Sequence, residues 1–303
     1  MFIIYILMII KEMNIKWKTT CNDKLNLDSV TSWKNNILVS SKDKHKIFGY
    51  DKVTGKLKFE IGDKGYDYDK LKRPSGITVI NDYLFVIERD NNRCQVFNLN
   101  NKKSIAFFGF KKLKKPYGIS GFFSKNQYVI FISDNELDTV FKFNLTIDSN
   151  EIKKINSSIF IELPGSSLES LYIDDKRSKI LVTEGSRKKI KVFNYDKILE
   201  YEIDNISNIK GISMSENSYI LADQKDDTAY FHMYDTDAIK YKFSLNSHLI
   251  KNINSVHYID GYLYLIDNEC SLFKMEYIDK SNITFYPVII LGGLVALFNI
   301  MKK

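Results

Sequence analysis

The sequence predicts an all-β fold, a six-bladed β-propeller whose blades are four-stranded sheets. A unit of short apolar strands recurs along the chain, and successive units begin roughly 40 to 50 residues apart, the spacing of propeller blades. No helical periodicity of useful length competes with this pattern. With 303 residues, 44% of them hydrophobic and 27% charged, the chain can bury a core of the required size.

The clearest unit is RPSGITVINDYLFVIERDNNRCQVFNL, residues 73–99. It holds an apolar strand, a tight polar turn, a second apolar strand that ends in charged residues, and an alternating third strand. Several units add a fourth strand, as in KLKFEI, SIAFFG and ILEYEI. The other units begin at Ser29, Tyr117, Leu168, Lys210 and Asn254.

The last unit lacks its outer strand. NIKWKTT, Asn14 to Thr20, has the composition of a strand but precedes the first blade. We expect it to run antiparallel to Ser271–Tyr277 and to close the ring, which removes an exposed sheet edge. The predicted blades therefore span residues 14–278.

This pairing also predicts a disulfide. With Asn14 opposite Tyr277 and Thr20 opposite Ser271, the next pair outward is Cys21 with Cys270, while Cys94 lies in another blade. Opposed residues on antiparallel strands bring their Cβ atoms close enough for a bridge. The alternative is three unrelated buried thiols.

Both termini change in character. Residues 1–12 form a short hydrophobic leader that is too short to span a bilayer and lacks the basic start and cleavage site of a signal peptide. Residues 283–301 form a hydrophobic tail, a candidate membrane anchor followed by a basic end. An extra strand or a buried helix on the propeller wall is the alternative. The tail and the disulfide together predict an extracytoplasmic or secretory compartment, with the tail as a candidate membrane anchor.

The charge pattern argues against a nucleic-acid partner. The net charge is +7, but basic residues are spread along the chain apart from KKLKK, residues 111–115. A nucleic-acid binder usually gathers its basic residues into one stripe or patch.

We expect the functional site on one face of the ring, where the first strand of each blade begins and the second strand ends. Carboxylates that converge there would hold a hard cation such as calcium, and Lys or Arg beside them would suit phosphate. Solvated turn residues are the alternative. The charged and aromatic candidates are Lys42, Asp43, Glu88, Arg89, Asp90, Tyr117, Asp134, Glu136, Glu169, Glu184, Arg187, Asp223, Lys225, Asp226, Asp267 and Glu269.

RPSGITV followed by DNNRCQVF resembles an NHL repeat, a motif of propellers that bind proteins or RNA. The whole chain, from about Trp17 to Tyr277, is more similar to the β-propeller phytases, which hydrolyse phosphate monoesters with bound calcium. The fragments that carry this resemblance are ILVSSKDKHKIFGYDKVTGKL, PYGISGFF, LESLYIDDKRSKILVTEGS and KGISMSENSYILADQKDDTAYFHMYD.

The resemblance implies roles for five residues. Lys42 and Arg89 match family residues that contact substrate phosphate, and Tyr117, Glu169 and Glu184 match residues of a calcium site. Lys42, Arg89 and Tyr117 would then be the catalytic residues.

The sequence also departs from the family. Where the family has an acidic pair before the Gly of the fifth blade, this chain has SNIKG, with Asn208 and Lys210, and HLIKNINS before the last blade has no acid. A lysine so close to a calcium site opposes the cation by several kcal/mol. We therefore expect a reduced site, with calcium near Tyr117, Glu169 and Glu184, and Lys42, Arg89 and Lys210 as ligand-binding residues.

Two functions follow from the resemblance. The first is a phytase-like phosphomonoester hydrolase with a reduced calcium and phosphate site, in which metal-polarised water attacks phosphorus. The alternative is a non-catalytic, NHL-like or degenerate phytase-like propeller that binds a phosphorylated ligand or a protein. The expected partner is accordingly a phytate-like phosphorylated small molecule or a protein.

Overall fold

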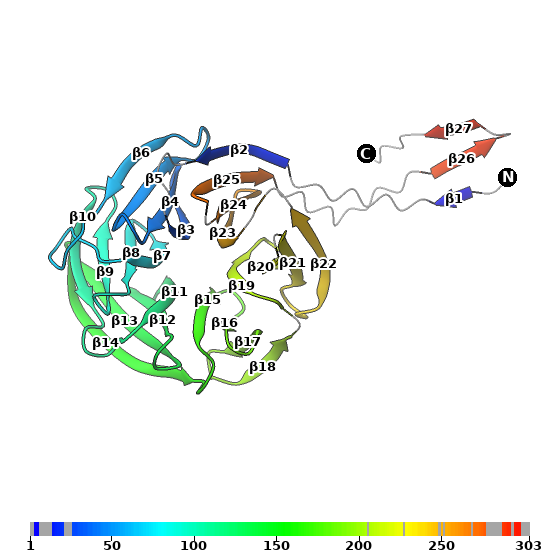
Figure 1. Cartoon of the computed structure of the whole chain (residues 1–303). Helices are drawn as coiled ribbons and strands as arrows, with labels where there is room; N and C mark the ends of the chain where they lie inside the picture. Colours follow the sequence, from blue (N-terminus) through cyan, green and yellow to red (C-terminus); the bar gives the residue numbers. More distant parts are fainter. Residues whose placement is uncertain are drawn as a thin grey trace.

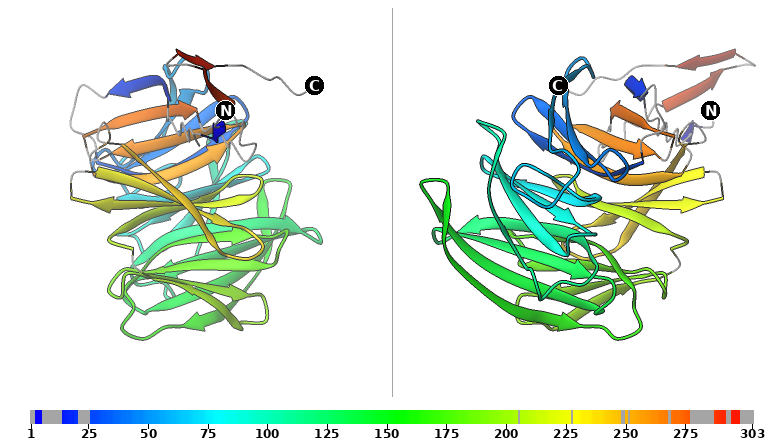
Figure 2. Two further views of the ribbon diagram at one scale, coloured as in Figure 1. Left: turned by 90° about the vertical axis from the view of Figure 1, so that its right-hand side faces the viewer. Right: turned by 60° about the vertical axis from the view of Figure 1, so that its left-hand side comes forward.

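A computed structural model of the chain confirms the predicted all-β fold. It describes residues 3–5, 14–20, 26–204, 206–226, 228–247, 250, 252–267, 269–276, 287–291 and 294–297. Six four-stranded antiparallel sheets surround a central channel, and the described residues form no helix (Figure 1). In the side views of Figure 2 the sheets follow one another around the ring in sequence order.

Each blade begins with the strand next to the channel and ends with the strand at the rim. Blades 1 to 3 comprise β3 (Leu27–Trp33), β4 (Asn36–Ser41), β5 (Lys46–Asp51) and β6 (Leu57–Ile61); β7 (Pro74–Ile80), β8 (Tyr83–Glu88), β9 (Arg93–Asn98) and β10 (Lys103–Phe108); and β11 (Pro116–Ser124), β12 (Gln127–Asp134), β13 (Thr139–Asp148) and β14 (Glu151–Glu162).

Blades 4 to 6 follow the same plan, except that the last blade takes its outer strand from the N-terminal region. They comprise β15 (Leu168–Asp174), β16 (Lys179–Glu184), β17 (Lys189–Asn194) and β18 (Leu199–Ile203); β19 (Ile209–Met214), β20 (Ser218–Lys225), β21 (Thr228–Asp235) and β22 (Tyr241–Ser247); and β23 (Ile253–Ile259), β24 (Tyr262–Asp267), β25 (Ser271–Glu276) and β2 (Asn14–Thr20).

The burial of each strand explains its composition. The second strands, such as ILVSS in β4 and LFVIE in β8, are buried at every position after their first residue. Both faces of these strands are covered by neighbouring blades, so their central residues form a continuous apolar run rather than an alternating one. The outer strands β6 and β18 are mostly exposed and carry charged residues at every second position.

The core consists of six apolar clusters, and each one fills the space between two neighbouring blades. Phe85 of blade 2, for example, packs with Tyr128 of blade 3, and Phe231 of blade 5 packs with Leu265 of blade 6. The cluster between blades 1 and 6 contains Tyr50 and Tyr264, so the core continues across the point where the ring closes. A ring of this kind leaves few exposed sheet edges.

The predicted closure of the ring is confirmed. β2 pairs antiparallel with β25, and Thr20 lies opposite Ser271 as expected. At the other end Asn14 lies opposite Glu276 rather than Tyr277, because a register shift between Ile15 and Trp17 adds one residue to β2. Such a bulge inserts a residue without ending the pairing.

The cysteines agree with this closure as far as they are described. Cys270 is disulfide-bonded, and Cys94 is free and buried. Cys21, the predicted partner of Cys270, lies outside the described residues.

The two faces of the ring can be told apart by the strand directions. We call the upper face the one on which the first strand of each blade begins and the second strand ends. On the opposite, lower face, Glu276 at the end of β25 lies opposite Tyr262, which follows the turn between β23 and β24. Asn14 pairs with Glu276 there, so the chain passes to both of its termini from the lower face.

The leader and the tail contribute three short strands that do not belong to the blades. β1 (Ile3–Tyr5) pairs with β26 (Pro287–Leu291), which in turn pairs with β27 (Leu294–Leu297). The tail segments that the structure describes pair with the leader and with each other rather than with a blade. The membrane anchor and its alternatives on the propeller wall stay predictions. Within the described residues no helix has the length and apolar character needed to cross a membrane. The remainder of the predicted leader and tail lies outside the described residues.

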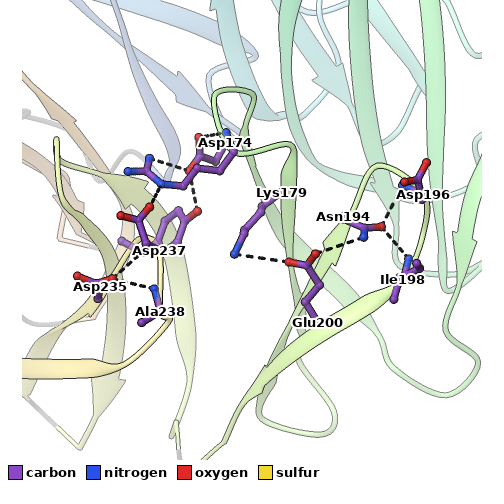
Figure 3. Close-up of polar contacts among 11 residues, drawn as sticks. Asp174, Lys179, Asn194, Asp196, Ile198, Glu200, Asp235, Asp237 and Ala238 are labelled. Carbon is purple, nitrogen blue, oxygen red and sulfur yellow. Dashed lines mark hydrogen bonds and ion pairs between the residues drawn. The ribbon is translucent and has the colours of Figure 1, made fainter.

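Polar contacts on the lower face join blades 4 and 5 (Figure 3). Buried Asp174 accepts a hydrogen bond from the Tyr219 hydroxyl of the next blade at 2.7 Å. Arg177 contacts both Asp174, at 3.3 Å, and Asp237, at 2.5 Å. These contacts stabilise the packing of blade 4 against blade 5. They lie on the lower face and not at the upper mouth of the channel.

Candidate functional site

The same irregularity recurs in every blade near the upper mouth of the channel. In all six blades the register between the first and second strands shifts close to the start of the first strand. Bulges of this kind redirect side chains and are frequent beside functional sites. The first residues within these shifts, which we call the inner ring, are Asp28, Ser75, Tyr117, Glu169, Lys210 and Asn254.

Two cations from neighbouring blades meet over one member of the inner ring. Lys42 follows the end of β4, and Arg89 follows the end of β8. The Nζ atom of Lys42 lies 5.7 Å from the centre of the Tyr117 ring, and the Cζ atom of Arg89 lies 4.9 Å from it. A cation over an aromatic face is attracted by the ring quadrupole, so Tyr117 holds both charges near the channel.

Asp28 is a mouth residue that the sequence analysis missed. Its carboxylate forms an ion pair with the Lys42 ammonium, and the two side chains are only 8% and 12% exposed. A signal was present, because LDS at residues 27–29 occupies the same place in its blade as LES at residues 168–170. Asp28 and Glu169 are thus equivalent carboxylates on blades 1 and 4.

The pKa values of Glu169 and Tyr117 at the mouth are both raised. Burial raises the pKa of Glu169, and the positive charges of Lys210 and Arg89 oppose that rise. Burial also raises the pKa of the Tyr117 hydroxyl, and the carboxylates of Asp28 and Glu169 raise it further. The Tyr117 hydroxyl therefore stays protonated at neutral pH and can donate a hydrogen bond.

Four of the six inner-ring residues line a cavity of about 140 Å³. Asp28, Tyr117, Lys210 and Asn254 line it near the upper face, and His257 lines it deeper in the channel. Burial lowers the pKa of His257 to about 4, and its Nε2 atom lies 3.0 Å from the Ser32 hydroxyl. The channel below the mouth is therefore lined by neutral groups at neutral pH.

The carboxylates at the ends of the second strands do not converge on the channel, contrary to expectation. These side chains are buried and accept hydrogen bonds from backbone amides of the loops beside them: Glu88 from Lys72 at 3.0 Å, Asp134 from Lys114 at 2.7 Å, Asp223 from Ser207 at 3.0 Å and Asp267 from Ser271 at 2.7 Å. Their role is structural, because each one satisfies amide groups that would otherwise be buried without a partner.

Glu184 belongs to the same structural position in blade 4. It is fully buried, and its Oε1 atom accepts from Ser166 and contacts Arg187 at 3.1 Å and Lys191 at 3.4 Å. Glu184 and Glu169 line a second, very small cavity of about 10 Å³.

The three predicted calcium ligands therefore do not form a calcium site of the usual kind. Tyr117 and Glu169 belong to the inner ring, while Glu184 is already paired with two cations. Among the described residues no group of three or more His, Cys, Asp or Glu side chains is placed to hold a metal ion. Calcium prefers six to eight oxygen ligands, several of them carboxylates, and this donor set does not fit it. Calcium binding stays a prediction of the resemblance alone.

The fold and the mouth together define a six-bladed β-propeller whose channel opens beneath a cluster of cations and carboxylates. The sequence matches no family model and no curated protein. Solved structures share the fold. Virginiamycin B lyase from Staphylococcus aureus is 9% identical with a TM-score of 0.62, and the match covers 88% of this chain and 100% of that one. A streptogramin B lyase is 14% identical with a TM-score of 0.57, covering 88% of this chain and 98% of that one.

Propellers described without reference to catalysis are equally similar. The β-propeller domain of Cps50 (Swd1) from Myceliophteria thermophila is 11% identical with a TM-score of 0.59, and the match covers 88% of this chain and 100% of that domain. These likenesses show the fold alone, since one fold can carry many unrelated functions. None of these structural similarities is specific to the phytases.

Proposed function

We propose that this propeller binds the phosphate group of a phosphorylated ligand at the upper mouth of its channel. The observation that carries the proposal is the meeting of Lys42 and Arg89 over the Tyr117 ring. Lys210 brings a third cation to the same mouth, beside the carboxylates of Asp28 and Glu169. Guanidinium and ammonium groups together suit a phosphate, because arginine offers a fork of donors and lysine a point charge.

The size of the cavity limits what can enter it. Sites for whole small molecules usually enclose about 300 to 1,000 Å³. The present cavity of about 140 Å³ has room for a single small group or a few waters. A phytate-like ligand would therefore place one phosphate in the mouth and leave its remainder on the upper face.

Phosphomonoester hydrolysis is the second candidate function. It is favoured by the fact that two of the three predicted catalytic residues, Lys42 and Arg89, both lie against the ring of the third, Tyr117. Glu169, with its raised pKa, is the mouth group best able to take a proton from an attacking water. We place binding first, because Glu184, one of the three predicted metal ligands, is paired with Arg187 and Lys191.

We also propose that the protein resides in an oxidising compartment. Cys270 is disulfide-bonded, and such bonds persist in secreted and extracytoplasmic proteins. An extracytoplasmic propeller, with anchoring to a membrane through its hydrophobic tail, accounts for this bond.

One experiment separates the two functions. Phytate and 4-nitrophenyl phosphate are titrated into the protein by calorimetry, and phosphate release is followed in parallel with calcium or with a chelator. Binding in the presence of chelator, with the ester recovered intact, is the expected result. Calcium-dependent release of phosphate would establish the hydrolase instead, and the absence of binding to either ester would contradict both functions.

A further inference from the structure

Two successive connections on the upper face carry nearly the same basic sequence. KLKR, residues 70–73, joins β6 to β7, and KLKK, residues 112–115, joins β10 to β11 on the neighbouring blade (Figure 1). The leucine of each is buried, with Leu71 0% and Leu113 2% exposed, while Lys111, Lys112, Lys114 and Lys115 are exposed. The leucine thus anchors each loop and turns its lysines outward.

Both loops are held firmly in place. The amide of Lys72 donates to buried Glu88 at 3.0 Å, and the amide of Lys114 donates to buried Asp134 at 2.7 Å. Gly109 precedes the second loop with a φ of 84°, and a Cβ atom there would lie 2.6 Å from Leu113. The backbone that carries the basic side chains is therefore ordered before any partner arrives.

Exposed aromatic rings accompany these lysines. Tyr66 is 62% exposed, Tyr68 55%, Phe107 40% and Phe110 63%. The rings of Tyr68 and Phe107 pack together with their centres 5.3 Å apart, and Lys72 lies over the Tyr66 ring at 4.6 Å. Large apolar side chains gathered at the surface and rimmed by charge mark interaction sites.

The turn between β8 and β9 connects the two loops. Asn91 donates to the Gly65 carbonyl of the first loop at 3.1 Å. Asn92, with its amide oriented to satisfy its hydrogen bonds, donates to the Lys114 carbonyl of the second loop at 2.7 Å. The two loops and their rings therefore form one continuous surface, which we call the basic aromatic patch: Tyr66, Tyr68, Lys70, Lys72, Arg73, Phe107, Phe110, Lys111, Lys112, Lys114 and Lys115.

We infer that the basic aromatic patch is a docking site for an acidic polypeptide segment that carries aromatic or aliphatic side chains. Acidic residues of the partner would pair with the exposed lysines, and its apolar side chains would cover the rings. The inference does not depend on phosphate binding at the channel mouth, since none of the patch residues lines that cavity.

The position of the patch favours a protein over a membrane. The chain passes to its hydrophobic tail from the lower face, whereas both basic loops lie on the upper face. A tail held in a bilayer would draw the lower face toward the lipid, and the patch would then point away from it.

Its charge pattern favours a protein over a nucleic acid. Carboxylates are mixed among the cations, with Asp67 lying 3.9 Å from Lys70 and Asp90 lying 3.9 Å from Arg73. These carboxylates would interrupt a continuous row of cations for the phosphates of a nucleic acid. A peptide of mixed acidic and apolar residues can place its apolar residues beside them. Because the loops are already ordered, little conformational entropy is lost when such a peptide binds.

The test measures fluorescence anisotropy with a short labelled peptide of Glu and Asp residues interrupted by Phe. We expect binding that weakens steeply as salt is added, because the contacts are between exposed charges. Replacing the four lysines 111, 112, 114 and 115 by Gln should weaken it at least about tenfold, the sum of four modest surface contacts. Phe110→Ser should weaken binding of this peptide but not of an otherwise equal peptide that lacks Phe.

The matched control replaces the exposed lysines Lys56, Lys154, Lys176 and Lys197, which lie outside the patch, by Gln. This variant should retain the affinity of the unmodified protein for the peptide. Equal binding by the patch and control variants, with both folded by circular dichroism, would overturn the inference. So would the absence of peptide binding, or tighter binding to anionic lipid vesicles or single-stranded RNA in the same buffer.

Discussion

Arg89 lies over the ring of Tyr117, with its guanidinium carbon 4.9 Å from the ring centre. The two residues come from different blades, and Lys42 of a third blade shares the same ring. Lys42 is paired with the carboxylate of Asp28, and the positive charge of Arg89 acts on the carboxylate of Glu169. The arrangement favours an anion that can contact both cations.

Anion binding should strengthen as the pH falls toward the pKa of Glu169. Burial raises that pKa, so the carboxylate takes up a proton at a higher pH than an exposed glutamate would. Protonation removes one negative charge from the mouth. Calorimetry with sulfate, which does not titrate in this range, should therefore show an affinity that rises severalfold between pH 7 and pH 5.

Glu169→Gln is the matched variant for this titration. It should bind sulfate at pH 7 as tightly as the unmodified protein does at low pH, and its affinity should no longer depend on pH. An unchanged pH dependence in Glu169→Gln would show that another group is responsible.

Lys210→Glu should raise the affinity for calcium. The substitution replaces a cation beside Glu169 with a carboxylate, and hard cations gain affinity with each such ligand. Calorimetry with calcium chloride compares the two proteins, with Lys176→Glu on the lower face as the control for net charge. If calcium binds neither the unmodified protein nor Lys210→Glu, the calcium site implied by the resemblance is wrong.

The denatured, unreduced protein should contain one titratable thiol. Cys270 is disulfide-bonded and Cys94 is free, so the predicted bridge from Cys270 to Cys21 leaves Cys94 alone to react. Treatment with a reductant should release three thiols and lower the free energy of unfolding by up to about 5 kcal/mol. Three thiols before reduction would contradict the bridge.

Asp134→Ala should lower the free energy of unfolding by about 2 to 4 kcal/mol, since buried amides lose their acceptor. Asp134 accepts from the amides of Lys114 and Lys115 and of the turn that follows it. Glu136→Ala, at an exposed position of that turn, is the control and should change the stability little. Equal stabilities of the two variants in denaturant titrations would refute the structural role of the buried carboxylates.

The fold could be predicted because the strand pattern of each blade is visible in a short stretch of its sequence. VFKFNL and IKVFNY, for example, mark the third strands of blades 3 and 4, and their spacing is enough to count blades. The closing strand was also predictable, because NIKWKTT had no other place in the repeat. The register of Asn14 was not, since the bulge between Ile15 and Trp17 leaves no mark in the alternation of side chains.

The site was harder to predict, because a position near a strand end does not tell which way a side chain points. Glu169 and Glu184 lie at opposite ends of adjacent strands on the same face, yet one belongs to the inner ring and the other is fully buried. The register shift at the start of each first strand makes this difference. Asp28 was missed for the same reason, although its place in LDS is the counterpart of Glu169 in LES.

The most direct test of phosphate binding at the mouth is the affinity of phytate for Arg89→Ala and Lys42→Ala, measured by calorimetry with Lys176→Ala as the control. Losing one charged hydrogen-bond donor to phosphate costs about 1.5 to 3 kcal/mol, so each mouth variant should bind at least about tenfold more weakly. Lys176→Ala, whose lysine is exposed on the lower face, should bind as the unmodified protein does. Equal affinities in all four proteins would contradict the proposed site.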